Sequence, residues 1–292
     1  MEKNQIIGVD LGGTNVRIGL LENEKIVKQI SKKISSKESQ NIVINEIVES
    51  INKVFNKNVI GIGIGVPSIV DIEKGIVYEV HNIPSWREVH LKEILENKFK
   101  VPVFVNNDVN CFVLGEKHFG KGKQYKDVIG LAMGTGLGGG IIVNGNLYAG
   151  KNCGAGEFGL MKYLDKNYEY YCSGQFFQYK YGLKGEDVLD DAKNGNHNAL
   201  KILEEFGEHM GNLINSIMYA LNPELIILGG SVSKAYNFFK KSMFNKINDY
   251  EFKTQLAQVK IEKSILKNSA ILGASSLVPN TKQKSNNYLI VS

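Results

Sequence analysis

Aliphatic runs alternate with glycine turns in the first part of this 292-residue chain. Residues 6–9 and 16–21 are rich in β-branched and other aliphatic side chains, and Gly12 and Gly13 lie in the short turn between them. This pattern predicts two antiparallel strands joined by a hairpin. The paired glycines permit positive φ angles and a close approach of a ligand to the backbone. In the alternative interpretation, the glycines serve only to make the turn.

A second copy of the pattern lies near the middle of the chain. An apolar run from Val128 to Met133 meets the turn Gly134-Thr135-Gly136, and another apolar run follows as far as Val143. A third glycine turn, Gly229-Gly230, comes after the predicted strand Glu224–Leu228. The repetition predicts a duplicated architecture in which both halves present a glycine turn to one phosphate chain.

Apolar side chains elsewhere recur at three- and four-residue spacing, which predicts amphipathic helices. Glu38–Asn56 and Ala199–Leu221 are the longest, and Asn222-Pro223 ends the second. The predicted strand Val59–Val66 has glycine at alternate positions, so one face is bare and open to close packing or to a ligand. The other predicted elements are the strands Ile26–Ser31 and Val103–Val105 and the helices Leu91–Phe99, Cys111–His118, Ser173–Tyr181, Gly185–Asn194, Tyr236–Asn245 and Ser269–Leu277.

The composition is that of a globular protein, with 43% hydrophobic and 22% charged residues. The net charge of +5 is modest, and the lysines are spread along the chain without a basic arm, which argues against nucleic acid as a partner. Cys111, Cys153 and Cys172 are an odd number without C-x-x-C spacing, as expected in a reducing compartment. No run approaches the roughly 18 to 20 apolar residues that span a bilayer. A cytoplasmic protein without a membrane partner is therefore expected.

Two carboxylates are candidates for chemistry. Asp10 precedes the first glycine turn, where it would hold a hydrated Mg²⁺ beside phosphates bound by the backbone and by the Thr14 hydroxyl. Asp108 follows a predicted strand in Asn106-Asn107-Asp108, and it would act in proton transfer or simply cap the next helix. Lys121 and Lys123 are within reach of a phosphate in the predicted arrangement, although a solvated charge is the simpler interpretation.

Five motifs carry a resemblance to a known family. They are D-L-G-G-T-N-V-R from Asp10, N-N-D at 106–108, G-T-G-L-G-G-G from Gly134, G-E-F-G at 156–159 and L-N-P-E-L-I-I-L-G-G ending at Gly230. In this order they resemble the ROK family (repressor, open reading frame, kinase) over nearly the whole chain. The resemblance implies an α/β fold of the two-domain actin-like ATPase (ribonuclease H-like) type, with duplicated mixed-sheet halves and an interdomain cleft. We expect a smaller domain at 1–112, completed by a C-terminal helix at about 269–292, and a larger domain at 113–268.

The resemblance also implies roles for individual residues. Asp108 corresponds to the general base that takes a proton from the attacking sugar hydroxyl, and Asn107 to the residue that orients the sugar. Asn82 lies in a segment similar to a sugar-binding loop of the family, although an Asn before Ile-Pro is by itself typical of a turn. Glu157 and Glu169 correspond to sugar-binding carboxylates. The residues implied in ATP binding are Asp10, Gly12, Gly13, Thr14, Asn15, Arg17, Gly134, Thr135, Gly136, Gly229 and Gly230.

The sequence departs from the family pattern in one loop. Leu160 replaces the histidine that ends the family motif G-E-x-G-H, and the family's cysteine-rich zinc loop is missing. Cys172 stands where a small Ala follows Tyr in the family pattern. Because structural zinc needs about four N or S ligands, we expect no zinc site. The family histidine contacts the sugar near its anomeric end, so its loss predicts weaker discrimination at C1 and C2.

An ATP-dependent hexose kinase is the function that the resemblance implies, with Mg²⁺ and ATP as cofactors and the 6-OH of glucose or a related hexose as acceptor. A fructokinase or N-acetylhexosamine kinase is the alternative within the family. A sugar-sensing regulator would carry a helix-turn-helix segment before the first hairpin, and only five residues precede Ile6. An actin-like ATPase without a sugar substrate would not need the sugar-side residues. A homodimer is common in the family, and the tail 279–292 has no assigned role.

Overall fold

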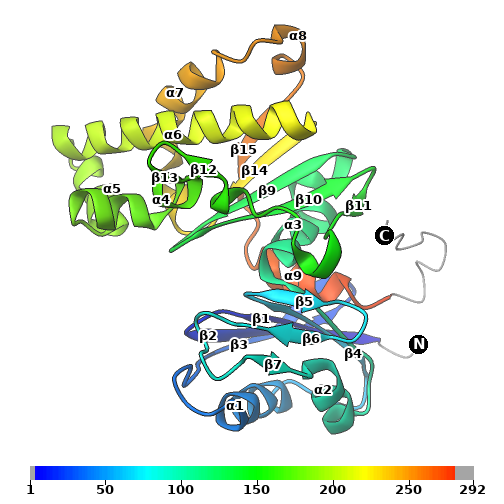
Figure 1. Cartoon of the computed structure of the whole chain (residues 1–292). Coiled ribbons are helices and arrows are strands. Elements are labelled where there is room, and N and C mark those ends of the chain that lie inside the picture. The colour runs from blue at the N-terminus through cyan, green and yellow to red at the C-terminus, as the bar shows by residue number, and fades with distance from the viewer. Residues whose placement is uncertain (1–3, 280–292) are drawn as a thin grey trace. The chain divides into compact units, whose positions relative to one another are not determined.

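The structure is a computed structural model that describes residues 4–279, and it divides into two compact units (Figure 1). Residues 4–123, 140–155 and 266–279 form the first unit, and residues 124–139 and 156–265 form the second. The predicted division after residue 112 falls inside α3 (Asp108–Phe119), which packs on α9 (Ser269–Ser276) within the first unit. The end of the predicted C-terminal helix, at 280–292, lies outside the described residues.

Two five-stranded sheets have matching strand orders, β3-β2-β1-β4-β8 and β11-β10-β9-β14-β15. In the first, β1 pairs antiparallel with β2 and parallel with β4, and in the second β9 pairs parallel with β14. The duplicated mixed-sheet architecture predicted from the two hairpins is confirmed. The strands are β1 (Gln5–Leu11), β2 (Asn15–Glu22), β3 (Lys25–Lys33), β4 (Val59–Val66), β8 (Val103–Asn107), β9 (Val128–Met133), β10 (Leu137–Val143), β11 (Asn146–Leu147), β14 (Leu225–Gly229) and β15 (Lys260–Lys263).

Helices cover both faces of the first sheet. In Figure 1, α1 (Gln40–Asn52) and α2 (Leu91–Phe99) lie on one side of it, and α3 and α9 lie on the other. The bare glycine face of β4 turns out to be a packing surface, because a Cβ at Gly63 would lie 1.8 Å from the carbonyl oxygen of Ala274 in α9. Another Cβ, at Gly273, would lie 1.7 Å from the carbonyl oxygen of Cys111 in α3. Glycine therefore brings α9 into backbone contact with both the sheet and α3.

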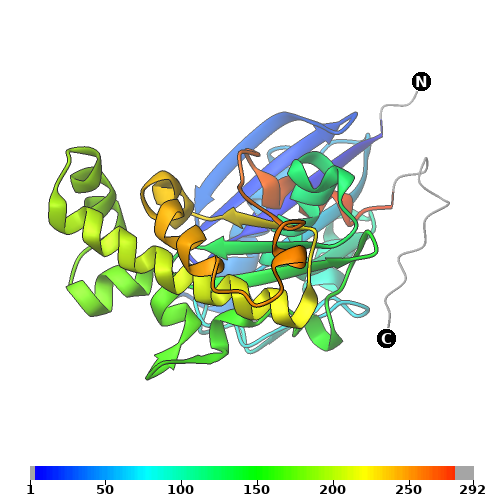
Figure 2. The ribbon, with the colours of Figure 1, turned by 90° about the horizontal axis from the view of Figure 1, so that it is seen from above.

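The second unit is built around a long helix, α6 (His197–Leu221), which is conspicuous in Figure 2. It packs against α4 (Tyr168–Cys172), α5 (Gly185–Lys193) and α7 (Tyr236–Ile247). The predicted helix Ser173–Tyr181 is confirmed from Gly174 to Tyr181, with a π-helical turn at Phe176–Lys180, whereas Ser173 itself is extended, with φ −134° and ψ −172°. The hydroxyl of Ser173 donates to the Thr135 carbonyl oxygen at 3.1 Å, which favours the break between the helices.

Several short elements carry no periodic signal in the sequence. They are the three-stranded sheet β5 (Ile69–Asp71), β6 (Ile76–Tyr78) and β7 (Glu88–Val89), the hairpin β12 (Lys162–Tyr163) and β13 (Lys166–Asn167), and α8 (Lys253–Leu256).

Candidate active site

The first hairpin fixes Asp10 opposite Arg17 in the β1–β2 register. The two side chains form an ion pair in which Arg17 donates to Oδ2 of Asp10. Asp10 is only 6% exposed, and burial raises the pKa of its carboxyl while the Arg17 charge opposes that shift. The turn of residues 12–15 therefore sets a buried carboxylate and a half-exposed guanidinium side by side at its base.

The glycines of this turn are needed for close approach. Neither Gly12 nor Gly13 adopts the positive φ that glycine permits. A Cβ at Gly13 would lie only 2.5 Å from the Cβ of Asn82, whereas a Cβ at Gly12 would lie at an ordinary 3.5 Å from the Asn15 carbonyl oxygen. The turn closes through a bond from the Gly12 N–H to that same oxygen at 2.8 Å, and the Asn15 amide donates to Thr14 Oγ1 at 3.0 Å. The first glycine turn and the Asn82 loop are thus in contact.

Backbone hydrogen bonds hold the loop that carries Asn82. Val80 donates to the Trp86 carbonyl oxygen at 3.0 Å, and Trp86 donates to that of Ile83 at 2.8 Å. Trp86, the one tryptophan of the sequence, is buried, whereas Asn82 in the same loop is exposed. The indole ring of Trp86 therefore anchors the loop, while the side-chain amide of Asn82 is exposed.

Asn107 and Asp108 lie at the junction of β8 and α3. The helix cap is Asn107, whose Oδ1 accepts from the N–H groups of Val109 at 2.8 Å and Asn110 at 3.2 Å. Its Nδ2 donates to the Ser68 carbonyl oxygen at 3.2 Å. Asp108 is the first residue of the helix, so the interpretation of Asp108 as the N-cap residue was wrong. Its partly buried carboxylate lies at the positive end of the α3 dipole.

Asn106 is a residue that the sequence did not single out. Its buried Oδ1 accepts from the Asn107 N–H at 2.8 Å, from Asn110 Nδ2 at 3.0 Å and from the Cys153 thiol at 3.3 Å. These bonds tie the strand end to the next helix turn and to a loop 47 residues further along the chain. The run of three amide-type residues was visible in the sequence, but the thiol partner was not.

Asp10 and Asp108 lie near one buried thiol. Burial raises the pKa of Cys111 well above its usual value, and the negative charges of Asp108 and Asp10 raise it further. The same cysteine packs against β4, since a Cβ at Gly65 would lie 3.0 Å from its sulfur and 3.3 Å from the Asp108 Cα. The structure therefore gathers the predicted phosphate-side and base carboxylates of the first unit around Cys111.

The second glycine turn contacts Glu169 in the second unit. A Cβ at Gly136 would lie 2.4 Å from Oε2 of Glu169, and the Leu137 N–H donates to that oxygen at 3.0 Å. Gln175 Nε2 donates to Oε1 at 2.8 Å. At Gly134, by contrast, a Cβ would meet no described atom within 4 Å. One end of this turn is open, and the other is packed against a predicted sugar-binding carboxylate.

The charge of Glu169 affects the pKa of the Glu157 carboxyl. Desolvation raises the pKa of the Glu157 carboxyl, and the negative charge of Glu169 raises it further. Two neighbouring carboxylates provide several acceptor sites for hydroxyl donors, which suits a polyhydroxylated ligand.

The raised pKa of Glu157 predicts an acid limit to sugar binding. In the sugar-binding role that the resemblance implies, its ionised form would accept sugar hydroxyls, so affinity should fall as the pH drops through a pKa that lies above the ordinary value of 4.5. We expect the acid limb of kcat/KM for the sugar to move to lower pH in Glu157→Gln, since an amide does not titrate. A pH–rate comparison of the two proteins checks this, and coincident acid limbs would rule out Glu157 as the group responsible.

A pocket of about 430 Å³ lies within the second unit. Its polar lining includes Thr135, Gln175 and Lys234, and its apolar lining includes Val232 and Ala235. The predicted Gly229-Gly230 turn lies just before this lining: Gly230 has φ +83°, and a Cβ there would lie 2.2 Å from the Met133 carbonyl oxygen. The turn therefore leads into the pocket, whose lining includes the predicted Gly134 and Thr135 together with residues that the sequence had not identified, among them Gln175, Gln178, Lys184, Glu186, Ser231 and Lys234.

In the loop that departs from the family pattern, the Leu160 side chain is 64% exposed. Cys172, at the end of α4, is completely buried. Across residues 4–279, no group of three or more His, Cys, Asp or Glu side chains is arranged to hold a metal ion. The absence of zinc remains a prediction, as do the cytoplasmic location, the homodimer and the absence of nucleic acid. Among the described helices, none has the length and apolar character to cross a membrane.

Comparison with known proteins gives consistent matches. The ROK family model matches residues 6–281. A glucokinase from Thermotoga maritima is 30% identical, over 95% of this chain and 98% of that protein. A xylose repressor from Caldicellulosiruptor bescii is 29% identical, over 94% of this chain and 77% of the repressor.

A solved structure has the same fold. The ROK family glucokinase from Streptomyces griseus, crystallised with glucose and AMPPNP, superposes with a TM-score of 0.80 at 24% identity, covering 94% of this chain and 98% of that one. The family match, the relatives and the two mixed sheets agree. The chain therefore belongs to the ROK family and has its actin-like ATPase fold.

Proposed function

We propose that this protein is an ATP-dependent hexose kinase that transfers the γ-phosphate of ATP to a sugar hydroxyl, the 6-OH of glucose or of a related hexose. The contact between Gly13 and Asn82 carries the proposal. It sets an exposed amide, suited to a sugar hydroxyl, directly against a turn suited to phosphate. Transfer between two substrates needs this kind of proximity, which an enzyme that only hydrolyses ATP does not.

Asp108 is the proposed general base, which accepts the proton of the attacking hydroxyl. Asn107 caps α3 through Oδ1, and its Nδ2 carries two hydrogens, of which one bonds Ser68 and the other would donate to the sugar. The bonds of Oδ1 to the Val109 and Asn110 N–H groups and of Nδ2 to Ser68 restrict the Asn107 side chain to one orientation. Asn82, Glu157 and Glu169 would complete the hydrogen bonds to the sugar.

The 430 Å³ pocket of the second unit would take the nucleoside of ATP, since its volume lies in the range of small-molecule sites. The Gly134-Thr135-Gly136 turn at its edge and the residue 12–15 turn of the first unit would bind phosphates through backbone N–H groups and the Thr14 and Thr135 hydroxyls. Lys184 and Lys234, which line the pocket, add positive charge. The glucokinase relatives, one of them crystallised with an ATP analogue, support this assignment.

Asp10 fits a magnesium site, because a hard carboxylate oxygen suits an ion that keeps most of its waters and takes phosphate oxygens as further ligands. Arg17 bonds only Oδ2, and the pair keeps the carboxylate fixed beside the turn. When bound, Mg²⁺ would neutralise charge on the phosphates. Asp10 would hold it, through water, at the turn.

Leu160 bears on which sugar is the substrate. An exposed leucine offers no hydrogen bond where the family has histidine, and a missing bond is worth about 0.5 to 1.5 kcal/mol. We propose weak discrimination at C1 and C2, so that fructose, mannose or an N-acetylhexosamine rivals glucose. The similarity to a xylose repressor supports a second candidate, a sugar sensor without catalysis.

A coupled ADP-release assay with Mg·ATP tests the proposal against glucose, fructose, mannose, N-acetylglucosamine and N-acetylmannosamine. We expect strong sugar-dependent turnover with at least one of them. Binding of a sugar, read from Trp86 fluorescence, without any ADP release would favour the sensor. A preference for glucose above about a hundredfold in kcat/KM would contradict the weak discrimination proposed for Leu160.

A further inference from the structure

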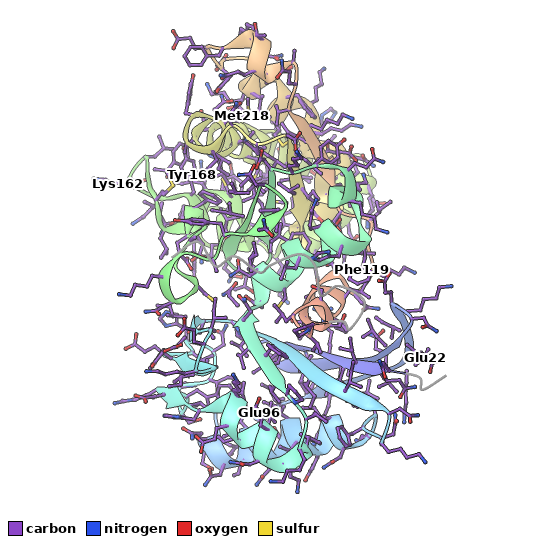
Figure 3. All side chains as sticks on the ribbon, turned by 90° about the vertical axis from the view of Figure 1, so that its right-hand side faces the viewer. Glu22, Glu96, Phe119, Lys162, Tyr168 and Met218 are labelled. Atoms are coloured by element: carbon purple, nitrogen blue, oxygen red, sulfur yellow. The ribbon has the colours of Figure 1, made fainter. Side chains whose placement is uncertain are left out.

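Four rings from three elements meet behind Glu169. The Tyr163 ring of β12 stacks on that of Tyr168 in α4, with centroids 4.3 Å apart and planes at 13°. It meets Tyr171 edge-on at 5.4 Å and 88°. His209 of α6 lies 4.6 Å from Tyr171 and 5.7 Å from Tyr163. Figure 3 labels Lys162 of β12, Tyr168 of α4 and Met218 of α6, one residue in each of the three elements that contribute the rings.

The polar atoms of this cluster bond to one face of α6. Tyr163 Oη lies 3.1 Å from Nδ1 of His209 and accepts from Asn212 Nδ2 at 2.8 Å. Tyr168 Oη lies 2.8 Å from Ser216 Oγ. Because positions 209, 212 and 216 are three and four residues apart, they share one side of the helix. The hairpin and α4 are therefore attached to α6 by directed bonds as well as by ring packing.

Donor and acceptor can be assigned for each bond that links Glu205, His209, Tyr163 and Asn212. Nε2 of His209 lies 3.4 Å from the carboxylate of Glu205, which only accepts, so Nε2 carries the ring proton. Burial lowers the pKa of His209, which favours the neutral ring. Nδ1 then accepts from the Tyr163 hydroxyl, and Asn212 donates to that same oxygen. Removing the Tyr163 hydroxyl would leave a buried acceptor and a donor without their partner.

Helix α4, which carries Glu169, is linked to this chain of bonds by the stacking of Tyr168 on Tyr163. Helix α4 has five residues, too few to be stable without tertiary contacts. Tyr168 and Tyr171 are buried on either side of Glu169, whose carboxylate reaches the Leu137 N–H and Gln175. The orientation of α4 therefore sets the position of the carboxylate.

We propose that Tyr163 is a positioning residue for the sugar site. Its hydroxyl, shared between His209 and Asn212, fixes α4 so that Glu169 presents its carboxylate both to the Leu137 amide and to the sugar. The inference rests on the proposed function for the role of Glu169 as a sugar ligand. The coupling between Tyr163 and the Glu169–Leu137 bond stands on the contacts alone.

Tyr163→Phe tests the proposal, because it keeps the stacked ring and removes the hydroxyl. We expect KM for the sugar to rise about fivefold, the loss of one neutral hydrogen bond, while kcat and KM for ATP stay within about twofold. Tyr250→Phe is the control, since Tyr250 is buried and likewise loses a single hydroxyl bond, that to Gln255 Oε1 at 3.0 Å, away from the site. It should leave both KM values unchanged.

Amide hydrogen exchange of the peptide covering residues 134–140 gives a second readout that does not depend on catalysis. The Leu137 N–H should exchange faster in Tyr163→Phe than in the wild-type protein, and not in Tyr250→Phe. Equal changes in the two KM values, or unaltered exchange, would overturn the positioning role. If no sugar is phosphorylated by the wild-type protein, the proposed function fails, and the exchange result still decides whether Tyr163 positions Glu169.

Discussion

Asp108→Asn is expected to lower kcat by about 10²- to 10⁴-fold, the usual contribution of a general base, with little change in KM for ATP. The amide is isosteric with the carboxylate and can still accept the bond that Asp108 Oδ1 receives from the Val109 N–H at 2.8 Å. Because Asn107, and not Asp108, supplies the helix cap, the substitution should leave α3 intact. Steady-state kinetics with a saturating sugar measure the effect.

The matched control for that prediction is Asp190→Asn. Asp190 pairs with Lys193 on the surface of α5 at 2.7 Å, and such exposed pairs contribute little to stability. It makes the same change of charge outside the site and should leave kcat unchanged. Turnover of Asp108→Asn within a few-fold of the wild-type protein would show that another group takes the proton.

Gly13→Ala is expected to raise KM for the sugar about tenfold, although Gly13 lies in the predicted phosphate turn. The new methyl group would lie 2.5 Å from the Cβ of Asn82, so one of the two segments must move. Displacing Asn82 would weaken the hydrogen bonds that we propose it makes to the sugar, and about 1.4 kcal/mol corresponds to a factor of ten. Gly12→Ala, whose methyl group would be at an ordinary 3.5 Å, should affect KM for ATP and not KM for the sugar.

A double-mutant cycle separates this steric route from a general loss of structure. If Gly13→Ala acts through Asn82, then Gly13→Ala combined with Asn82→Ala should bind sugar no more weakly than Asn82→Ala alone. Additive effects on KM for the sugar would contradict the coupling between the phosphate turn and the Asn82 loop.

The sequence predicted the two hairpins well because their strands are long, uninterrupted aliphatic runs. Helices α2 and α5 were also predicted closely, as both have clear apolar spacing. The sheet β5-β6-β7 was missed since its strands have two or three residues, too short to show a period. Helix α4 was missed because it has only five residues, and the extended Ser173 that ends it bonds the Thr135 carbonyl oxygen from 38 residues earlier in the chain.

For the site, the sequence supplied residue types and the structure supplied their partners. Asn107 and Asp108 were both identified as candidates, but spacing alone could not say which of two adjacent polar residues caps α3. The sequence showed that the glycines of the first turn permit positive φ angles and close approach, and the structure shows that the contact with Asn82 explains Gly13. Likewise, Gly136 packs against Glu169, which lies 33 positions further along the chain and is visible only once the chain is folded.

The most direct test of the central claim is to identify the phosphorylated product. The protein is incubated with Mg·ATP and glucose, or with whichever hexose turns over fastest, and the products are followed by phosphorus and proton NMR. Our account predicts a hexose 6-phosphate formed in step with ADP, and a loss of nearly all of it in Asp108→Asn. Release of ADP with inorganic phosphate and no sugar phosphate, or an undiminished rate of sugar phosphorylation in Asp108→Asn, would contradict it.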